Sequence, residues 1–173
     1  MDMRRIEKRG QRLFFNRRGL TLIEILTAAA ILAASFALFY NVFIINWTAL
    51  EGYIVRNQLW QEAATVIRLM SADGRGAKAI DIVEITSSRK AVRFIDKTST
   101  PIALYEIFPN GNLQRSDGGG NTTLMSDNVF FGSSSFVKNG QALEIILSLR
   151  APVLIKTVQI STVNEIFPRN YRN

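Results

Sequence analysis

The sequence predicts an α+β fold in which one long N-terminal helix, transmembrane in its first half, packs on an antiparallel β-sheet head. Three observations indicate this fold class. Residues 25–50 carry no charged side chain and are rich in Ile, Leu, Ala and Phe. Apolar residues then recur at helical spacing to about residue 72, and the rest of the chain alternates short β-branched or aromatic runs with turn residues.

The apolar run meets the length requirement for a membrane-spanning helix. About 20 residues at a rise of ~1.5 Å cross a hydrocarbon core of ~30 Å. We therefore assign residues 20–46 to the transmembrane helix and 47–72 to its amphipathic continuation, with Trp47 and Tyr53 at the outer interface. The turn signal Ser71-Ala72-Asp73-Gly74-Arg75-Gly76 ends this helix, and residues 73–173 form a β-rich exported head domain.

The positive charge of the chain is concentrated in a short leader, residues 1–19. The net charge is +7, but the leader holds seven basic side chains against two acidic ones. A nucleic-acid-binding domain would spread its basic residues over a folded face, so no direct nucleic-acid binding is expected. By the positive-inside rule, a basic leader before an apolar run keeps the N-terminus cytoplasmic. We expect a single-pass protein of the cytoplasmic (inner) membrane whose C-terminal domain is periplasmic or extracellular.

The spacing of apolar residues predicts which face of the amphipathic helix is apolar and where the strands lie. The helix residues expected to share one face are Leu50, Tyr53, Ile54, Trp60, Ala63, Ala64, Ile67 and Met70. Strands are expected over 80–86, 91–95, 102–108, 143–149 and 154–160, with weaker candidates over 112–115, 123–125 and 129–131. The dipeptides Asn110-Gly111 and Asn139-Gly140 predict hairpin turns because they tolerate positive φ. A meandering antiparallel sheet follows.

The absence of cysteine and histidine restricts the chemistry. Disulfides, thiol catalysis and thiolate metal sites are excluded, as are serine-hydrolase triads and histidine-bearing zinc sites. No other constellation indicates catalysis, so we predict neither enzyme activity nor a cofactor. Asp117, Asn121 and Asp127 offer oxygen ligands that calcium accepts, but their spacing matches no known loop. We interpret these weak calcium candidates as solvated loop residues and predict no metal site.

Glu24 is the one charged residue between positions 20 and 50. A carboxylate near the membrane centre costs ~2.5–3.5 kcal/mol. At a helix start held at the surface, the same group gains ~0.3–1 kcal/mol from the helix dipole. If the chain is cut after Gly19, Leu20 acquires a free amine, and Glu24 lies ~6 Å further along the helix. The amine of one subunit can then pair with the carboxylate of a neighbouring subunit that is displaced along the helix axis, which suggests polymerisation.

A conventional secretory signal cleaved near Ala28-Ala29-Ala30 is disfavoured because Glu24 interrupts its apolar region and the apolar run continues far beyond.

The segment Arg17-Arg18-Gly19-Leu20-Thr21-Leu22-Ile23-Glu24, with the apolar run behind it, resembles the class III prepilin signal of type IV pilins and type II secretion pseudopilins. The resemblance implies a pilin-like fold and cleavage between Gly19 and Leu20 by prepilin peptidase. It also implies N-methylation of Leu20 and a role for Glu24 in filament assembly. Arg17 and Arg18 belong to the leader that sets the topology. Leu20 stands where phenylalanine is commoner in this family.

The order of elements beyond the signal also resembles the J-type minor pseudopilins. The resemblance rests on a polar turn and strand start over 75–80, strands over 92–95 and 102–108, and the segment Leu113-Gln114-Arg115. It implies a minor subunit that initiates or tips a type IV pilus-like or type II secretion pseudopilus filament, serving protein secretion, adhesion or DNA uptake. The implied partners are other pilins or pseudopilins, prepilin peptidase, the inner-membrane assembly platform and membrane lipid. The alternative is a signal-anchored, exported monomeric binding domain that is not assembled into a filament.

Overall fold

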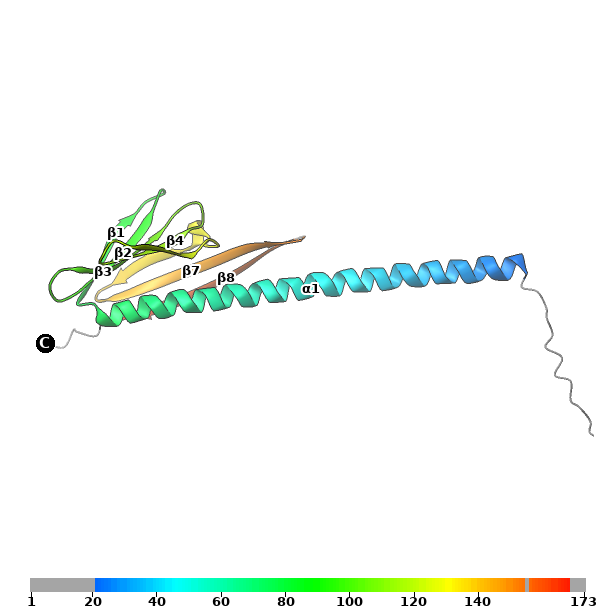
Figure 1. Ribbon diagram of the computed structural model, residues 1–173, viewed down its shortest axis with the longest axis horizontal. Coiled ribbons are helices and arrows are strands. Elements are labelled where there is room, and N and C mark those ends of the chain that lie inside the picture. The colour runs from blue at the N-terminus through cyan, green and yellow to red at the C-terminus, as the bar shows by residue number, and fades with distance from the viewer. Residues whose placement is uncertain (1–20, 155, 169–173) are drawn as a thin grey trace, which may run out of the picture. The chain divides into compact units, whose positions relative to one another are not determined.

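The computed structural model describes residues 21–154 and 156–168 (Figure 1). One helix, α1 (Leu22–Gly76), precedes all the strands. The strands and the short 3₁₀ helix η1 are β1 (Ala79–Ile85), β2 (Lys90–Ile95), β3 (Pro101–Ile107), β4 (Leu113–Asp117), β5 (Thr122–Ser126), η1 (Phe131–Ser133), β6 (Ser135–Asn139), β7 (Ala142–Val153) and β8 (Lys156–Ile166).

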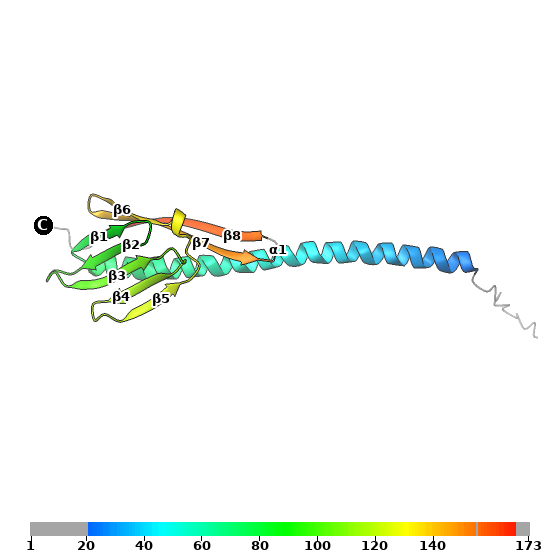
Figure 2. The same ribbon diagram turned by 90° about the horizontal axis from the view of Figure 1, so that it is seen from above.

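The strands form two antiparallel sheets, and each sheet is a meander (Figure 2). The five-stranded sheet has the order β1-β2-β3-β4-β5, and the three-stranded sheet has the order β6-β7-β8. Side chains from α1 and from both sheets share one hydrophobic core. The predicted α+β fold, with a long N-terminal helix on an antiparallel sheet, is confirmed.

Two compact units make up the chain. The first is Met1–Ile44, and the second, here called the head unit, is Ile45–Asn173. Helix α1 contributes residues to both units. As predicted, the helix that begins in the apolar run therefore continues into the residues that pack on the sheets.

The two strands of the β7–β8 hairpin differ most from their predicted bounds. They were expected over 143–149 and 154–160, but β7 extends to Val153 and β8 to Ile166. An unbroken ladder from the Leu143–Ile166 pair to the Val153–Lys156 pair stabilises the additional residues. The strand expected over 129–131 is wrong, because Val129 forms only an isolated bridge and Phe131 begins η1.

The helix face that meets the sheets also differs from the predicted one. Leu50, Tyr53, Ile54 and Trp60 are exposed. The buried residues of α1 are Gly52, Leu59, Ala63, Val66, Met70 and Gly74. Apolar side chains occupy more than one face of this helix, so periodicity alone could not identify the face that packs on the sheets.

The end of α1 lies at Gly76, four residues beyond the predicted end near Ala72. The residues that look like a turn signal are helical because tertiary contacts hold them. Gly74 is buried, and a Cβ added there would lie 2.3 Å from Ile166 Cγ2 and 3.3 Å from Phe94 Cε1. At this position glycine allows the helix to approach β8 and β2 closely rather than ending the helix.

This close approach predicts opposite effects for two neighbouring glycines. In an unobstructed helix, alanine is more stable than glycine by ~0.5–1 kcal/mol. Gly74→Ala should instead lower the free energy of unfolding by ~1–3 kcal/mol, because the core cannot accept the methyl group without repacking. Gly76→Ala is the matched control, since its Cβ would first meet Ile102 Cδ1 at 3.8 Å. Denaturant unfolding of the full chain in detergent measures both, and equal effects would contradict the steric explanation.

Candidate functional site

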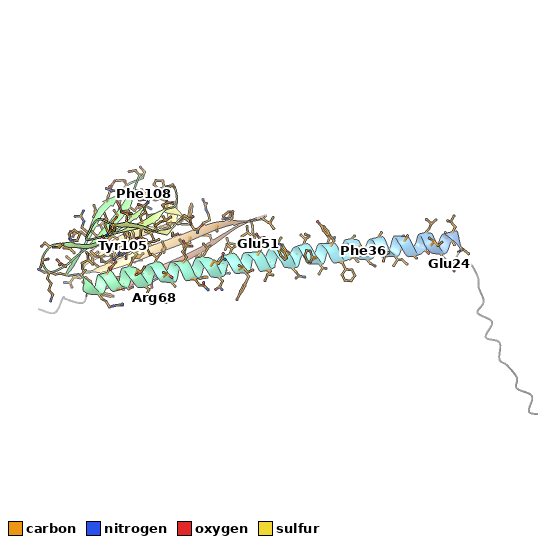
Figure 3. All side chains as sticks on the ribbon, in the orientation of Figure 1. Glu24, Phe36, Glu51, Arg68, Tyr105 and Phe108 are labelled. Carbon is orange, nitrogen blue, oxygen red and sulfur yellow. The ribbon has the colours of Figure 1, made fainter. Side chains whose placement is uncertain are left out.

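The start of α1 is capped by reciprocal hydrogen bonds between Thr21 and Glu24. Figure 3 labels Glu24 at this end of the helix. The Thr21 amide and hydroxyl donate to Glu24 Oε2 at 2.8 and 2.9 Å, and the Glu24 amide donates to Thr21 Oγ1 at 3.3 Å. This arrangement is a capping box, which satisfies helix amides that have no intrahelical acceptor. Glu24 therefore has a local structural role. Thr21 was not among the predicted site residues, although the Thr-x-x-Glu spacing could have identified it.

The four residues before the capping box lie outside the described residues. They are Arg17, Arg18, Gly19 and Leu20. The proposed cut between Gly19 and Leu20, the methylation of Leu20 and the topological role of the two arginines stay predictions.

The first part of α1 presents apolar side chains on every face. Large apolar residues from Leu22 to Ile45 are exposed, and Phe36 in Figure 3 is an example. By length and composition, α1 can cross a membrane. Each Å² of apolar surface left in water costs roughly 25 cal/mol, so this segment needs lipid or other apolar helices around it.

A partly buried polar cluster joins the end of α1 to the five-stranded sheet. Asp73 Oδ2 accepts hydrogen bonds from the Tyr105 hydroxyl at 2.6 Å and from Arg115 Nε at 2.9 Å, and Arg115 Nη2 donates to Asp73 Oδ1 at 3.1 Å. Burial, together with the carboxylate, raises the pKa of the Tyr105 hydroxyl. The hydrogen bond to Asp73 raises the pKa of the Arg115 guanidinium. The tyrosine therefore stays a neutral donor and the arginine a cation near neutral pH, and Arg115 of Leu113-Gln114-Arg115 acts as a structural anchor.

A second anchor, Lys90, links β2 to η1. Its ammonium donates to the carbonyl oxygens of Phe131 and Ser134 at 2.7 and 2.6 Å and lies 4.4 Å from the centroid of the Phe131 ring. Burial lowers the pKa of this ammonium. These bonds connect the five-stranded sheet to the segment that leads into β6.

The calcium candidates fall at opposite ends of the β4–β5 hairpin. Asp117 accepts hydrogen bonds from the amide and side chain of Asn121 in the connecting turn. Asp127 follows Ser126, which pairs with Leu113 at the other end of the hairpin. Within residues 21–154 and 156–168, no three acidic side chains gather as metal ligands would. Asp117 and Asn121 stabilise their own turn, and Asp127 is not part of that group.

No family model, curated protein or solved structure matches the chain. The features that bear on function are therefore those of the chain itself. They are the signal-like segment over 17–24, the exposed apolar surface of α1, and the carboxylate at the start of that surface.

Proposed function

We propose that this chain is a structural subunit of a pilin-like filament, held in the cytoplasmic membrane by α1 until it is assembled. One observation carries the proposal. The exposed apolar surface of α1 carries a carboxylate, Glu24, in its first turn, at the end of a segment that resembles a prepilin cleavage signal. Such a helix is inserted in lipid as a monomer and surrounded by other helices in a filament.

The hydrogen bonds of Glu24 do not neutralise its charge. Both bonds to its carboxylate come from Thr21, an uncharged residue, and both reach Oε2. Among the described residues, no basic side chain forms an ion pair with Glu24. Cleavage after Gly19 would create an ammonium on Leu20. In an assembled bundle, that ammonium on a neighbouring subunit is the partner that removes the cost of a lone charge.

Exposed apolar side chains continue on the head unit's part of α1. They are Trp47, Leu50, Tyr53, Ile54, Trp60 and Leu69. A helix that is apolar on more than one face is normally covered on each of them. Packing against the helices of neighbouring subunits would cover the faces that the sheets leave exposed, which supports assembly beyond the membrane as well as within it.

The order of strands supports a minor subunit that initiates or tips the filament. The tyrosine-bearing strand β3 lies between β2 and β4, and β4 carries Leu113-Gln114-Arg115, as in the resemblance to J-type pseudopilins. Other pilins or pseudopilins, prepilin peptidase and an inner-membrane assembly platform are the partners that this function requires.

The capping box favours the alternative, a signal-anchored monomer with an exported binding domain. It gives Glu24 a role that needs no second subunit, because a capping carboxylate stabilises an isolated helix. A filament subunit should start at Leu20 and need the charge of Glu24 for assembly. An anchored monomer does not require either.

The intact mass of the protein isolated from membranes of the producing organism tests the proposal. We expect a chain that starts at N-methylated Leu20. Gly19→Arg is the control, because it removes the small residue at the proposed cut and should leave the leader attached. Conventional cleavage near residue 28 should not respond to Gly19→Arg. A mature chain that starts at Met1, or beyond Glu24, would refute the filament proposal.

A further inference from the structure

The closed end of the β7–β8 hairpin lies beside the helical segment of the head unit. The Val153–Lys156 pair closes the ladder, and Leu154 belongs to the turn. A Cβ added to the buried Gly52 would lie 3.4 Å from Lys156 Cε and 3.6 Å from Lys156 Nζ. Figures 1 and 2 both show this end of the hairpin pointing toward the N-terminal residues of that helical segment.

The length of the chain places this hairpin end near the outer membrane surface. If the uncharged run enters the hydrocarbon core at Ile25, about 20 helical residues cross it, to about residue 45. The headgroups add roughly 5–7 Å on each side. Gly52 follows residue 45 by at most ~10 Å at helical rise, so the chain keeps Gly52, and Lys156 beside it, within reach of the headgroups.

The exposed surface at this end is apolar and basic. Leu154 and Tyr53 are 68% and 70% exposed, and the basic side chains Arg56 and Lys156 are exposed as well. Tyr53, Arg56 and Lys156 line one groove of about 500 Å³. Among the described residues, neither Arg56 nor Lys156 forms an ion pair.

The acidic residue at the same end, Glu51, is half-buried. Glu51 Oε2 is enclosed by the protein and accepts no hydrogen bond from the described residues. The exposed charged side chains at this end, Arg56 and Lys156, are both basic. Aromatic rings favour the headgroup level, and basic side chains near a bilayer attract anionic lipids.

We propose that the end of the β7–β8 hairpin, with Tyr53 and Arg56, docks on the outer surface of an anionic phospholipid bilayer. Leu154 enters the headgroup layer, and Lys156 and Arg56 contact lipid phosphates. The inference rests on the membrane anchoring in the proposed function and is independent of filament assembly. Docking would fix the head unit against the membrane surface.

Single cysteines test this docking cleanly because the chain has none of its own. A fluorophore is placed at Leu154→Cys, at Val163→Cys and at Phe36→Cys in the full chain, which is reconstituted into phosphatidylcholine vesicles with or without phosphatidylglycerol. Quenchers are attached to lipid headgroups or to acyl chains. Val163 is the matched control, because it is 59% exposed on the same strand and lies seven residues from Lys156, or ~23 Å at the strand rise.

The Phe36 probe reports anchoring, and the Leu154 probe reports docking. We expect acyl-chain quenching at position 36, and headgroup quenching that is stronger at 154 than at 163 when phosphatidylglycerol is present. Lys156→Gln and Arg56→Gln should each reduce the ratio of docked to free head about fivefold. Lys138→Gln, which changes an exposed lysine on β6, should leave the ratio unchanged.

Two results would overturn the inference, and they are distinct from a failure of anchoring. If position 36 is quenched by acyl chains but position 154 is quenched no more than 163, the helix is inserted and the hairpin does not dock. If docking is the same in neutral vesicles or survives both glutamine variants, anionic lipid is not its partner. If position 36 is not quenched, the anchoring in the proposed function fails, and the docking proposal fails with it.

Discussion

Replacing Glu24 by glutamine is expected to reduce the amount of the chain in filaments tenfold or more, while its insertion into the membrane is unchanged. Glutamine at this position still accepts the hydrogen bonds of the capping box, so the helix start is preserved and only the charge is lost. In the proposed filament, the ammonium that cleavage creates on Leu20 of a neighbouring subunit would then be unpaired among apolar helices, at a cost on the order of 2–3 kcal/mol. The measurement compares the chain in sheared filaments with the chain left in membranes.

Thr21→Ala is the matched control because it removes the cap and keeps the charge. Loss of an N-cap costs ~0.5–2 kcal/mol of helix stability, which frays the first turn but leaves the carboxylate available for pairing. We expect Thr21→Ala to assemble nearly as the wild type does, and Glu24→Ala to fail as Glu24→Gln does. If Glu24→Gln assembles normally, or if Thr21→Ala fails equally, Glu24 acts only as a cap and the anchored monomer is the better interpretation.

Replacing Asp73 by alanine should destabilise the head unit by ~2–4 kcal/mol, which is the largest loss that we expect from one polar side chain. The change leaves Arg115 without its counter-ion and the buried Tyr105 hydroxyl without its acceptor. Breaking a fully buried pair costs ~3–5 kcal/mol. We expect a smaller loss of stability here because the side chains of Asp73 and Arg115 are still 14% and 25% exposed to solvent.

Denaturant unfolding of the full chain in detergent, followed by near-ultraviolet circular dichroism, measures this loss. Asp81→Ala is the control, since Asp81 lies 3.9 Å from Lys138 and both side chains are largely exposed. Exposed ion pairs contribute little to stability, so the control should unfold at nearly the wild-type denaturant concentration. Similar shifts for Asp73→Ala and Asp81→Ala would show that the cluster at the end of α1 does not anchor the helix to the sheet.

The predictions that the structure confirms depend on a few consecutive residues. The absence of charge over 25–50 and the β-branched runs are properties of short windows, so they predicted the helix and most strands. The two Asn-Gly dipeptides also act locally, and both glycines have positive φ in hairpin turns, 92° at Gly111 and 63° at Gly140. The capping box is equally local, but it was not predicted, although the spacing of Thr21 and Glu24 could have identified it.

The remaining features depend on residues far apart in the sequence. Asp73 and Arg115 are 42 positions apart. From the local sequence, Asp73 therefore looks like an ordinary turn residue and Arg115 like an ordinary exposed arginine. The end of α1 likewise depends on distant residues, because a Cβ on Gly74 would meet side chains of Ile166 and Phe94.

The sequence by itself determined the long helix followed by antiparallel strands, the apolar run with its single carboxylate, and the two Asn-Gly turns, because charge, hydrophobicity and backbone preference are properties of residues and their near neighbours. Only the tertiary structure decided which helix face is buried, where the helix ends, and that Lys156 lies beside Gly52. Several faces and end points of the helix have nearly the same local free energy, and close packing in the core decides which of them the protein adopts.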